Sequence, residues 1–102
     1  MKKGGCALIV LKRYSDGIKL EGHANYAPHG CDIVCAGVST LIQNLIQSIE
    51  ELTDDKISYS MQSGKIDIEF GDLSERGQVL MDSFFIGLSM IAESYPNHVK
   101  IA

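Results

Sequence analysis

The stretch DIVCAGVSTLIQNLIQSIEEL, residues 32–52, decides the fold because it is the longest periodic segment of the chain. Its apolar side chains recur at steps of three and four residues, the spacing of one face of a helix. They are Val34, Val38, Leu41, Leu45, Ile49 and Leu52, with Ile33, Ile42 and Ile46 widening the stripe. Asp32 precedes the stripe and predicts an N-cap that accepts a hydrogen bond from the backbone of Cys35. We therefore predict a helix over residues 32–52.

Segments typical of strands lie on both sides of this helix. Residues 6–13 are mostly apolar, and residues 18–22 alternate after an Asp-Gly turn signal. After the helix, residues 57–62 and 65–70 alternate strictly around Ser63-Gly64. Strict alternation indicates strands with one buried face and one solvated face. The chain is therefore expected to contain two hairpins, one before the helix and one after it.

A second helix is predicted from Glu75 to Glu93, with Ser74 as its cap and Pro96 as its stop. Its inward residues are predicted to be Val79, Leu80, Phe84, Leu88 and Ile91, and residues 99–101 are expected to add a short edge strand. The order ββαββα predicts the α+β class, as a two-layer fold with an antiparallel sheet and two helices on one face. We expect residues 1–102 to form one domain.

Composition limits the function classes. The chain has 102 residues, a formal net charge of −4 and three cysteines. Its nine lysines and arginines are scattered, so no direct nucleic-acid binding is expected. We find no secretory segment and no run that approaches a membrane span, so we expect a cytoplasmic protein, away from membranes, with reduced thiols.

The segment GHANYAPHGCDIVC, residues 22–35, carries the candidate site. His23 ends a strand-like run, and Cys35 lies at the predicted helix start, so the two could meet where strand and helix diverge. A thiol acts as a nucleophile only as thiolate, and a nearby imidazole or a helix N-terminus favours that form. Residues 24–31 are predicted to form a loop that acts as a gate, with Gly30 as its hinge.

Each of these residues also has an ordinary structural interpretation. Cys35 could be a small buried core residue, and Asp32 is more often a cap than a catalytic acid. Strict alternation places His23 on the solvated face with Lys19, unless Gly22 bends the end of the strand.

Ser39 lies one turn after Cys35 and therefore shares its helix face. An alternative use of the same segment is zinc binding, for which the ligands would be Cys31, Cys35, His23 and His29. The C-x₃-C spacing and the position across a helix boundary argue against it.

The segments GHA at residues 22–24, Gly30 and DIVCAGVS at residues 32–39 resemble the ribosomal-processing cysteine protease family (Prp) of Firmicutes and related bacteria. The predicted element order and the length are also similar. The resemblance implies a cysteine endopeptidase that removes the short N-terminal extension of large-subunit ribosomal protein twenty-seven, after a pair of aromatic residues. It further implies a cytoplasmic homodimer. A basic ribosomal partner suits the negative charge of this chain.

The family pattern maps onto this chain residue by residue. Cys35 matches the nucleophile and His23 its acid–base partner, while Asp32 and Ser39 match supporting positions. We predict that backbone N–H groups of residues 32–35 stabilise the oxyanion. No cofactor and no metal are expected.

Two further expectations concern partners. Phe85, Ile86 and Met90 add apolar surface to the second helix beyond one stripe, which predicts a homodimer. The main alternative to the protease is a non-catalytic module that binds a ribosomal protein without cleaving it; the zinc-binding domain is less favoured.

Overall fold

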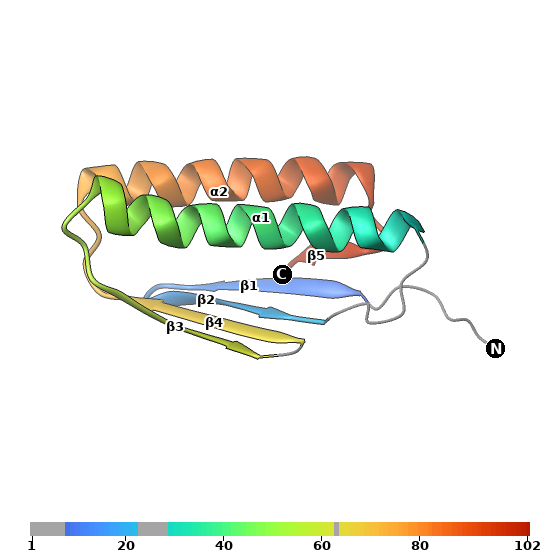
Figure 1. Ribbon diagram of the computed structural model, residues 1–102, viewed down its shortest axis with the longest axis horizontal. Helices are drawn as coiled ribbons and strands as arrows, with labels where there is room; N and C mark the ends of the chain where they lie inside the picture. Colours follow the sequence, from blue (N-terminus) through green and yellow to red (C-terminus); the bar gives the residue numbers. More distant parts are fainter. Residues whose placement is uncertain (1–7, 23–28, 63) are drawn as a thin grey trace.

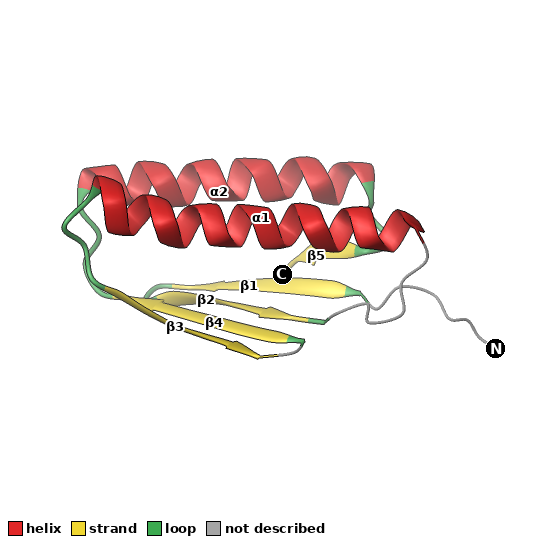
Figure 2. Ribbon diagram, in the orientation of Figure 1, coloured by secondary structure: helices red, strands yellow, loops and turns green. Residues whose placement is uncertain are grey.

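The computed structural model describes residues 8–22, 29–62 and 64–102, and for residues 29–32 it describes the backbone alone. Within these residues the elements are β1 (Ile9–Tyr14), β2 (Gly17–Glu21), α1 (His29–Leu52), β3 (Ile57–Gln62), β4 (Lys65–Phe70), α2 (Glu75–Ser94) and β5 (Val99–Ile101). The two helices lie side by side on one face of the sheet (Figures 1 and 2). The predicted α+β class and its two layers are confirmed.

The described strands form one sheet in the order β3-β4-β2-β1-β5. β3, β4, β2 and β1 pair antiparallel with their neighbours, whereas β5 pairs parallel with β1. The sheet is therefore mixed, not wholly antiparallel as predicted. The reason is that α2 forms a crossover that returns β5 parallel to β4, and β4 runs in the same direction as β1 because both pair antiparallel with β2.

The alternation along the strands decides which face of the sheet is buried. Leu11 of β1 faces Leu20 of β2, and Ile18 of β2 faces Ile68 of β4, and all four side chains are buried under the helices. On the opposite face the charged side chains of Lys12, Lys19 and Glu69 are exposed, and that of Asp67 is half-buried. Because the side-chain period of a strand is two, each strand contributes one apolar row to the core.

Helix α1 begins at His29, earlier than the predicted start at Asp32. The sequence predicts a loop up to residue 31, but a single glycine such as Gly30 is tolerated inside a helix at a cost of about 1 kcal/mol relative to alanine. Asp32 is therefore inside the helix and is not its N-cap. Gly30 is likewise a helical residue, so it is not the hinge of a loop.

Helix α2 begins as predicted, because the Ser74 side chain accepts a hydrogen bond from the Gly77 N–H. Its buried face consists of Gly77, Met81, Phe84 and Leu88. Val79, predicted to point inward, is 65% exposed. Met81 lies two residues further along, about 200° around the helix, so burying Met81 turns Val79 outward.

The core fills the space between the two layers. Its buried apolar residues are Ile9, Leu11, Ile18, Leu20, Val34, Val38, Ile42, Leu45, Ile46, Ile49, Ile68, Phe70, Met81, Phe84, Leu88 and Val99. The segment Ile33–Leu52 is also long and apolar enough to cross a membrane by length and composition, contrary to the prediction that no run approaches a span. Since its apolar side forms this core, and core helices meet the same criterion, the segment gives no argument for a membrane.

Candidate active site

Cys35 lies on α1 at the side that faces the sheet. It is half-buried, forms no disulfide and packs against the apolar core next to Val34 and Val38. Unlike those two neighbours, which are 2% exposed, it keeps part of its surface open. The cysteine is therefore neither sealed in the core nor on the outer surface of the helix, and a substrate can approach it.

The start of α1 at His29 changes the electrostatic argument for Cys35. In an α-helix each N–H bonds to the carbonyl four residues back, so within α1 only the N–H groups of residues 29–31 have no intrahelical acceptor. Cys35 lies in the second turn, not in the first as predicted. None of the four predicted oxyanion donors at residues 32–35 falls among these groups. The electrostatic effect of the helix end, which falls off within the first turn, is therefore weaker at Cys35 than predicted.

Gly22 ends β2 in a conformation that interrupts the strand. Its φ is +111°, and its N–H donates to the Gly64 carbonyl at 2.9 Å. A Cβ at this position would overlap the Leu8 carbonyl oxygen, so glycine is required. The alternation that placed His23 on the solvated face does not continue through such a residue. His23 itself lies outside the described residues.

A cleft of about 340 Å³ joins these parts of the chain. Cys35, Val38 and Ser39 line it from α1, and Gly22 lines it from the end of β2. The remaining lining residues come from the strands and the β3–β4 turn: Ile9, Leu20, Met61, Gln62, Gly64, Lys65 and Ile66. The structure therefore brings the cysteine together with the residue that directly precedes His23 in the chain.

Ser39 is the second polar group that α1 presents to the cleft. Its position one turn from Cys35 places the two residues about 6 Å apart along the helix axis. Ser39 is exposed and lines the cleft, and its hydroxyl has no hydrogen-bond partner among the described residues. Its hydroxyl is therefore available to a bound molecule.

The β3–β4 turn is a part of the site that sequence reasoning missed. Glu21 pairs with Lys65 across β2 and β4, which brings this turn beside the end of β2. The turn signal Ser63-Gly64 was visible in the sequence, but its position next to Gly22 depends on strand order. Nothing local to residues 57–70 specifies that β4 pairs with β2.

Other predicted features lie wholly or partly outside the described residues. These are the gate over residues 24–31, of which 24–28 lie outside the described residues and 29–31 belong to α1, and three of the four proposed zinc ligands. Within the described part of the chain, no three histidine, cysteine or acidic side chains are grouped as metal ligands. A larger hollow, of about 560 Å³, lies on the opposite face of the sheet around Tyr14, Lys19 and Asp67. It contains no cysteine, so the smaller cleft is the candidate site.

A thiol that opens into a cleft beside an unpaired hydroxyl, on a two-layer α+β scaffold, defines the class of a thiol-dependent enzyme. The family model of cysteine protease Prp matches residues 8–100 of this chain, and the chain belongs to that family. It is a cysteine protease, which removes the interpretation as a binding module without chemistry.

Individual relatives agree with this assignment. The ribosomal processing cysteine protease Prp of Mycoplasma genitalium is 34% identical over 85 residues, covering 79% of this chain and 81% of the relative. The protein of the same name from Staphylococcus aureus is 28% identical over 85 residues, covering 80% of each chain. A crystal structure of the S. aureus protease Prp with a substrate peptide has a TM-score of 0.81 at 20% identity, covering 94% and 97% of the two chains. At that identity the structural likeness supports the fold.

Proposed function

We propose that this protease removes the short N-terminal extension of large-subunit ribosomal protein twenty-seven, with Cys35 as nucleophile and His23 as acid and base. The observation that carries the assignment is that Cys35 and Gly22 line one cleft. Gly22 is bonded directly to His23, and its positive φ frees the chain from strand alternation at this point. The names of the relatives, which are ribosomal processing proteases, support the substrate class.

The chemistry proceeds in two steps. The Cys35 thiolate attacks the scissile carbonyl carbon, and His23 gives its proton to the leaving amine as the C–N bond breaks. His23 then takes a proton from water, whose oxygen attacks the thioester carbonyl as the C–S bond breaks; this releases the carboxylic acid and restores the Cys35 thiolate with a protonated His23. The oxyanion of each tetrahedral intermediate needs donors, and the free N–H groups at the start of α1 are the nearest backbone candidates.

Asp32 and Ser39 have supporting roles in this proposal. Residues 32, 35 and 39 follow the three- and four-residue spacing that aligns positions on one side of a helix. Ser39 offers a hydroxyl to the substrate backbone beside the reacting carbonyl. The net charge of −4 favours the encounter with a basic ribosomal protein.

Incubation with two forms of the ribosomal protein, with and without its extension, tests the function. We expect one new N-terminus, read by mass spectrometry, from the extended form and no product from the processed form. Cleavage at scattered sites in both forms would contradict the proposed substrate. Retention of activity after dialysis against a chelator would separate the thiol mechanism from the zinc alternative.

We also propose a cytoplasmic homodimer. On α2, the exposed apolar residues are Val79, Ile86 and Met90, at 65%, 64% and 62% exposure. Phe85, which was expected among them, is half-buried, with the Arg13 guanidinium 4.3 Å from its ring centre. Light scattering should give twice the chain mass, and Ile86→Glu should reduce it to a monomer. A monomeric mass for the unmodified chain at micromolar concentration would contradict the dimer.

A further inference from the structure

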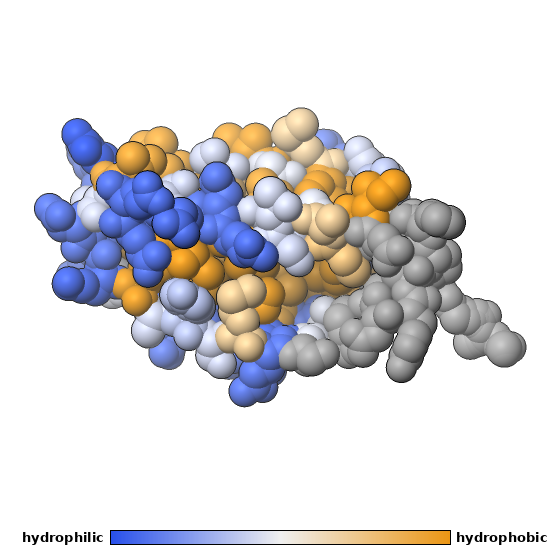
Figure 3. Space-filling view, viewed as in Figure 1, coloured by the Kyte–Doolittle hydropathy of each residue, from blue (hydrophilic) through white to orange (hydrophobic). Residues whose placement is uncertain are grey.

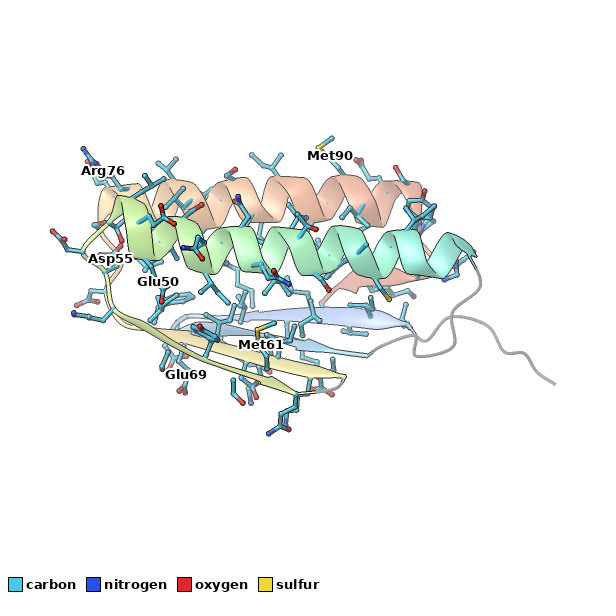
Figure 4. All side chains as sticks on the ribbon, viewed as in Figure 1. Glu50, Asp55, Met61, Glu69, Arg76 and Met90 are labelled. Carbon is cyan, nitrogen blue, oxygen red and sulfur yellow. The ribbon has the colours of Figure 1, made fainter. Side chains whose placement is uncertain are left out.

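The helix-facing side of β3 is left uncovered. Tyr59 and Met61 pair with Ile68 and Ile66 of β4, and opposite residues in an antiparallel pair point to the same face. Ile68 is 1% exposed on that face, yet Tyr59 is 49% and Met61 46% exposed. Figure 4 shows Met61 rising from β3 toward the helix layer. The helices therefore cover β4 and leave an apolar shelf, Tyr59 and Met61, on β3.

This shelf is continuous with the catalytic cleft. Met61 lines the cleft that also contains Cys35, and Tyr59 lies two residues further along the same strand face. Figure 3 shows apolar surface between α1 and the strands that lie below it in this view. A chain that leaves the cleft at Met61 in an extended form therefore passes over Tyr59 next.

The backbone of β3 also has a free side. β3 is the outermost strand of the sheet, so its outer N–H and C=O groups have no strand partner among the described residues. An extended peptide can add to such an edge through main-chain hydrogen bonds while alternate side chains occupy neighbouring pockets. Residues two apart in a strand are about 6.6 Å apart, and the same spacing holds in an extended ligand.

We propose that the shelf formed by Tyr59 and Met61 is a specificity subsite, on which two large apolar substrate side chains, two positions apart, rest beside the free edge of β3. The proposal rests on the proposed peptide-cleaving function of Cys35 and extends it to substrate selection. The flexible thioether of Met61 adapts to different apolar shapes, and Tyr59 offers a flat ring to stack against. The occupant is the substrate peptide, because the shelf opens into the cleft of the nucleophile.

The substrate side of the proposal is tested with the N-terminal extension of the ribosomal protein as a synthetic peptide. Each residue in turn is replaced by serine, and kcat/KM is measured with the unmodified enzyme. We expect two apolar positions, two residues apart, at which kcat/KM falls about tenfold, the size typical of losing an apolar contact. Equal effects at all positions, or none, would overturn the subsite.

The enzyme side uses Tyr59→Ser and Met61→Ser, with Tyr14→Ser as the matched control. Tyr14 is 45% exposed, a fraction similar to the 49% of Tyr59. It belongs to β1, however, and lines the hollow on the opposite face of the sheet. Each shelf variant should have a kcat/KM about tenfold lower on the native peptide. In each variant, replacing the peptide residue at one of the two positions by serine should no longer lower kcat/KM further. Tyr14→Ser should behave as the unmodified enzyme.

The outcomes separate the two proposals. If the unmodified enzyme leaves the peptide uncut, the proposed function and the subsite both fail. If it cuts the peptide and the shelf variants cut equally well, the subsite alone fails. Thermal unfolding confirms that the variants are folded. Light scattering tests whether a second copy of this chain occupies the open edge instead. A shelf variant that loses activity only because the subunit mass has changed would overturn the subsite in favour of a second copy of this chain.

Discussion

The two ends of α1 are built in opposite ways. At its C-terminal end, Asp55 accepts hydrogen bonds from the Ser74 N–H at 3.1 Å and from the Ser74 hydroxyl at 2.8 Å, which holds the start of α2. Ser74 in turn caps α2 through Gly77. At the other end, Cys35 and Ser39 face an open cleft, and the Ser39 hydroxyl has no partner among the described residues. The polar groups at the C-terminal end stabilise the fold, whereas those at the cleft end are available to a ligand.

Figure 4 places Asp55 and Arg76 together at the closed end, far along the helices from the cleft end. This contrast indicates that satisfied hydrogen bonds mark the structural end of this molecule, whereas unsatisfied polar groups in a concave surface mark the functional end. Substitutions at the open end should therefore affect cleavage more than stability, and those at the closed end should do the reverse.

The largest expected effect is at the open end. Cys35→Ala should lower kcat/KM by about a thousandfold or more, because the nucleophile is lost, and His23→Ala should also lower it severely. Alanine is a good helix former, so the free energy of unfolding should change by less than about 1 kcal/mol. Peptide cleavage and urea unfolding measure the two quantities. Full activity of either purified variant would remove that residue from the catalytic assignment.

Gly22→Ala should lower both the stability of the protein and its cleavage activity. The added Cβ meets the Leu8 carbonyl oxygen at a backbone conformation that alanine avoids, so we expect about 3 kcal/mol of destabilisation, with loss of cleavage. Gly71→Ala is the control, because a Cβ there has no atom within 4 Å. Urea unfolding of both variants checks this prediction. Equal stability of the two would show that Gly22 is not a fixed wall of the cleft.

Asp55→Ala should affect the closed end alone. It leaves the Ser74 N–H and hydroxyl without their acceptor, which should cost about 1–2 kcal/mol of stability. Its neighbour Asp54 is exposed, and Asp54→Ala should change stability by less than about 0.5 kcal/mol. Below the unfolding temperature, both variants should cleave at the rate of the unmodified enzyme. A fall in kcat for Asp55→Ala would mean that the two ends are coupled.

The smallest expected effect concerns thiol reactivity. Cys35 should be alkylated fastest of the three cysteines near neutral pH, and His23→Ala should slow that labelling about severalfold. Because Cys35 lies in the second turn of α1, we expect the helix end to contribute less to this reactivity than the His23 imidazole. Timed alkylation with peptide mapping separates the three thiols. Unchanged labelling of Cys35 in His23→Ala would assign its reactivity to another group.

Much of the fold was predictable because its signals are local. The alternation of Ile57, Tyr59 and Met61 gave the bounds of β3, and the Ser74 cap gave the start of α2. Of the site, Cys35 and Ser39 could be paired on one helix face from their spacing alone. The cleft that they line could not be predicted, because it also needs Gly22 and the β3–β4 turn, which are far apart in the sequence.

The sequence by itself determined the periodicities, and hence the α+β class and the order of the elements, because these follow from interactions between near neighbours in the chain. Tertiary structure decided between options that the local pattern leaves equal. Helix α2 has two apolar stripes, and only packing buries Met81 and turns Val79 to solvent. Likewise, only sheet assembly sets β5 parallel to β1 and leaves β3 with a free edge beside the cleft, since strand order depends on burying one shared core.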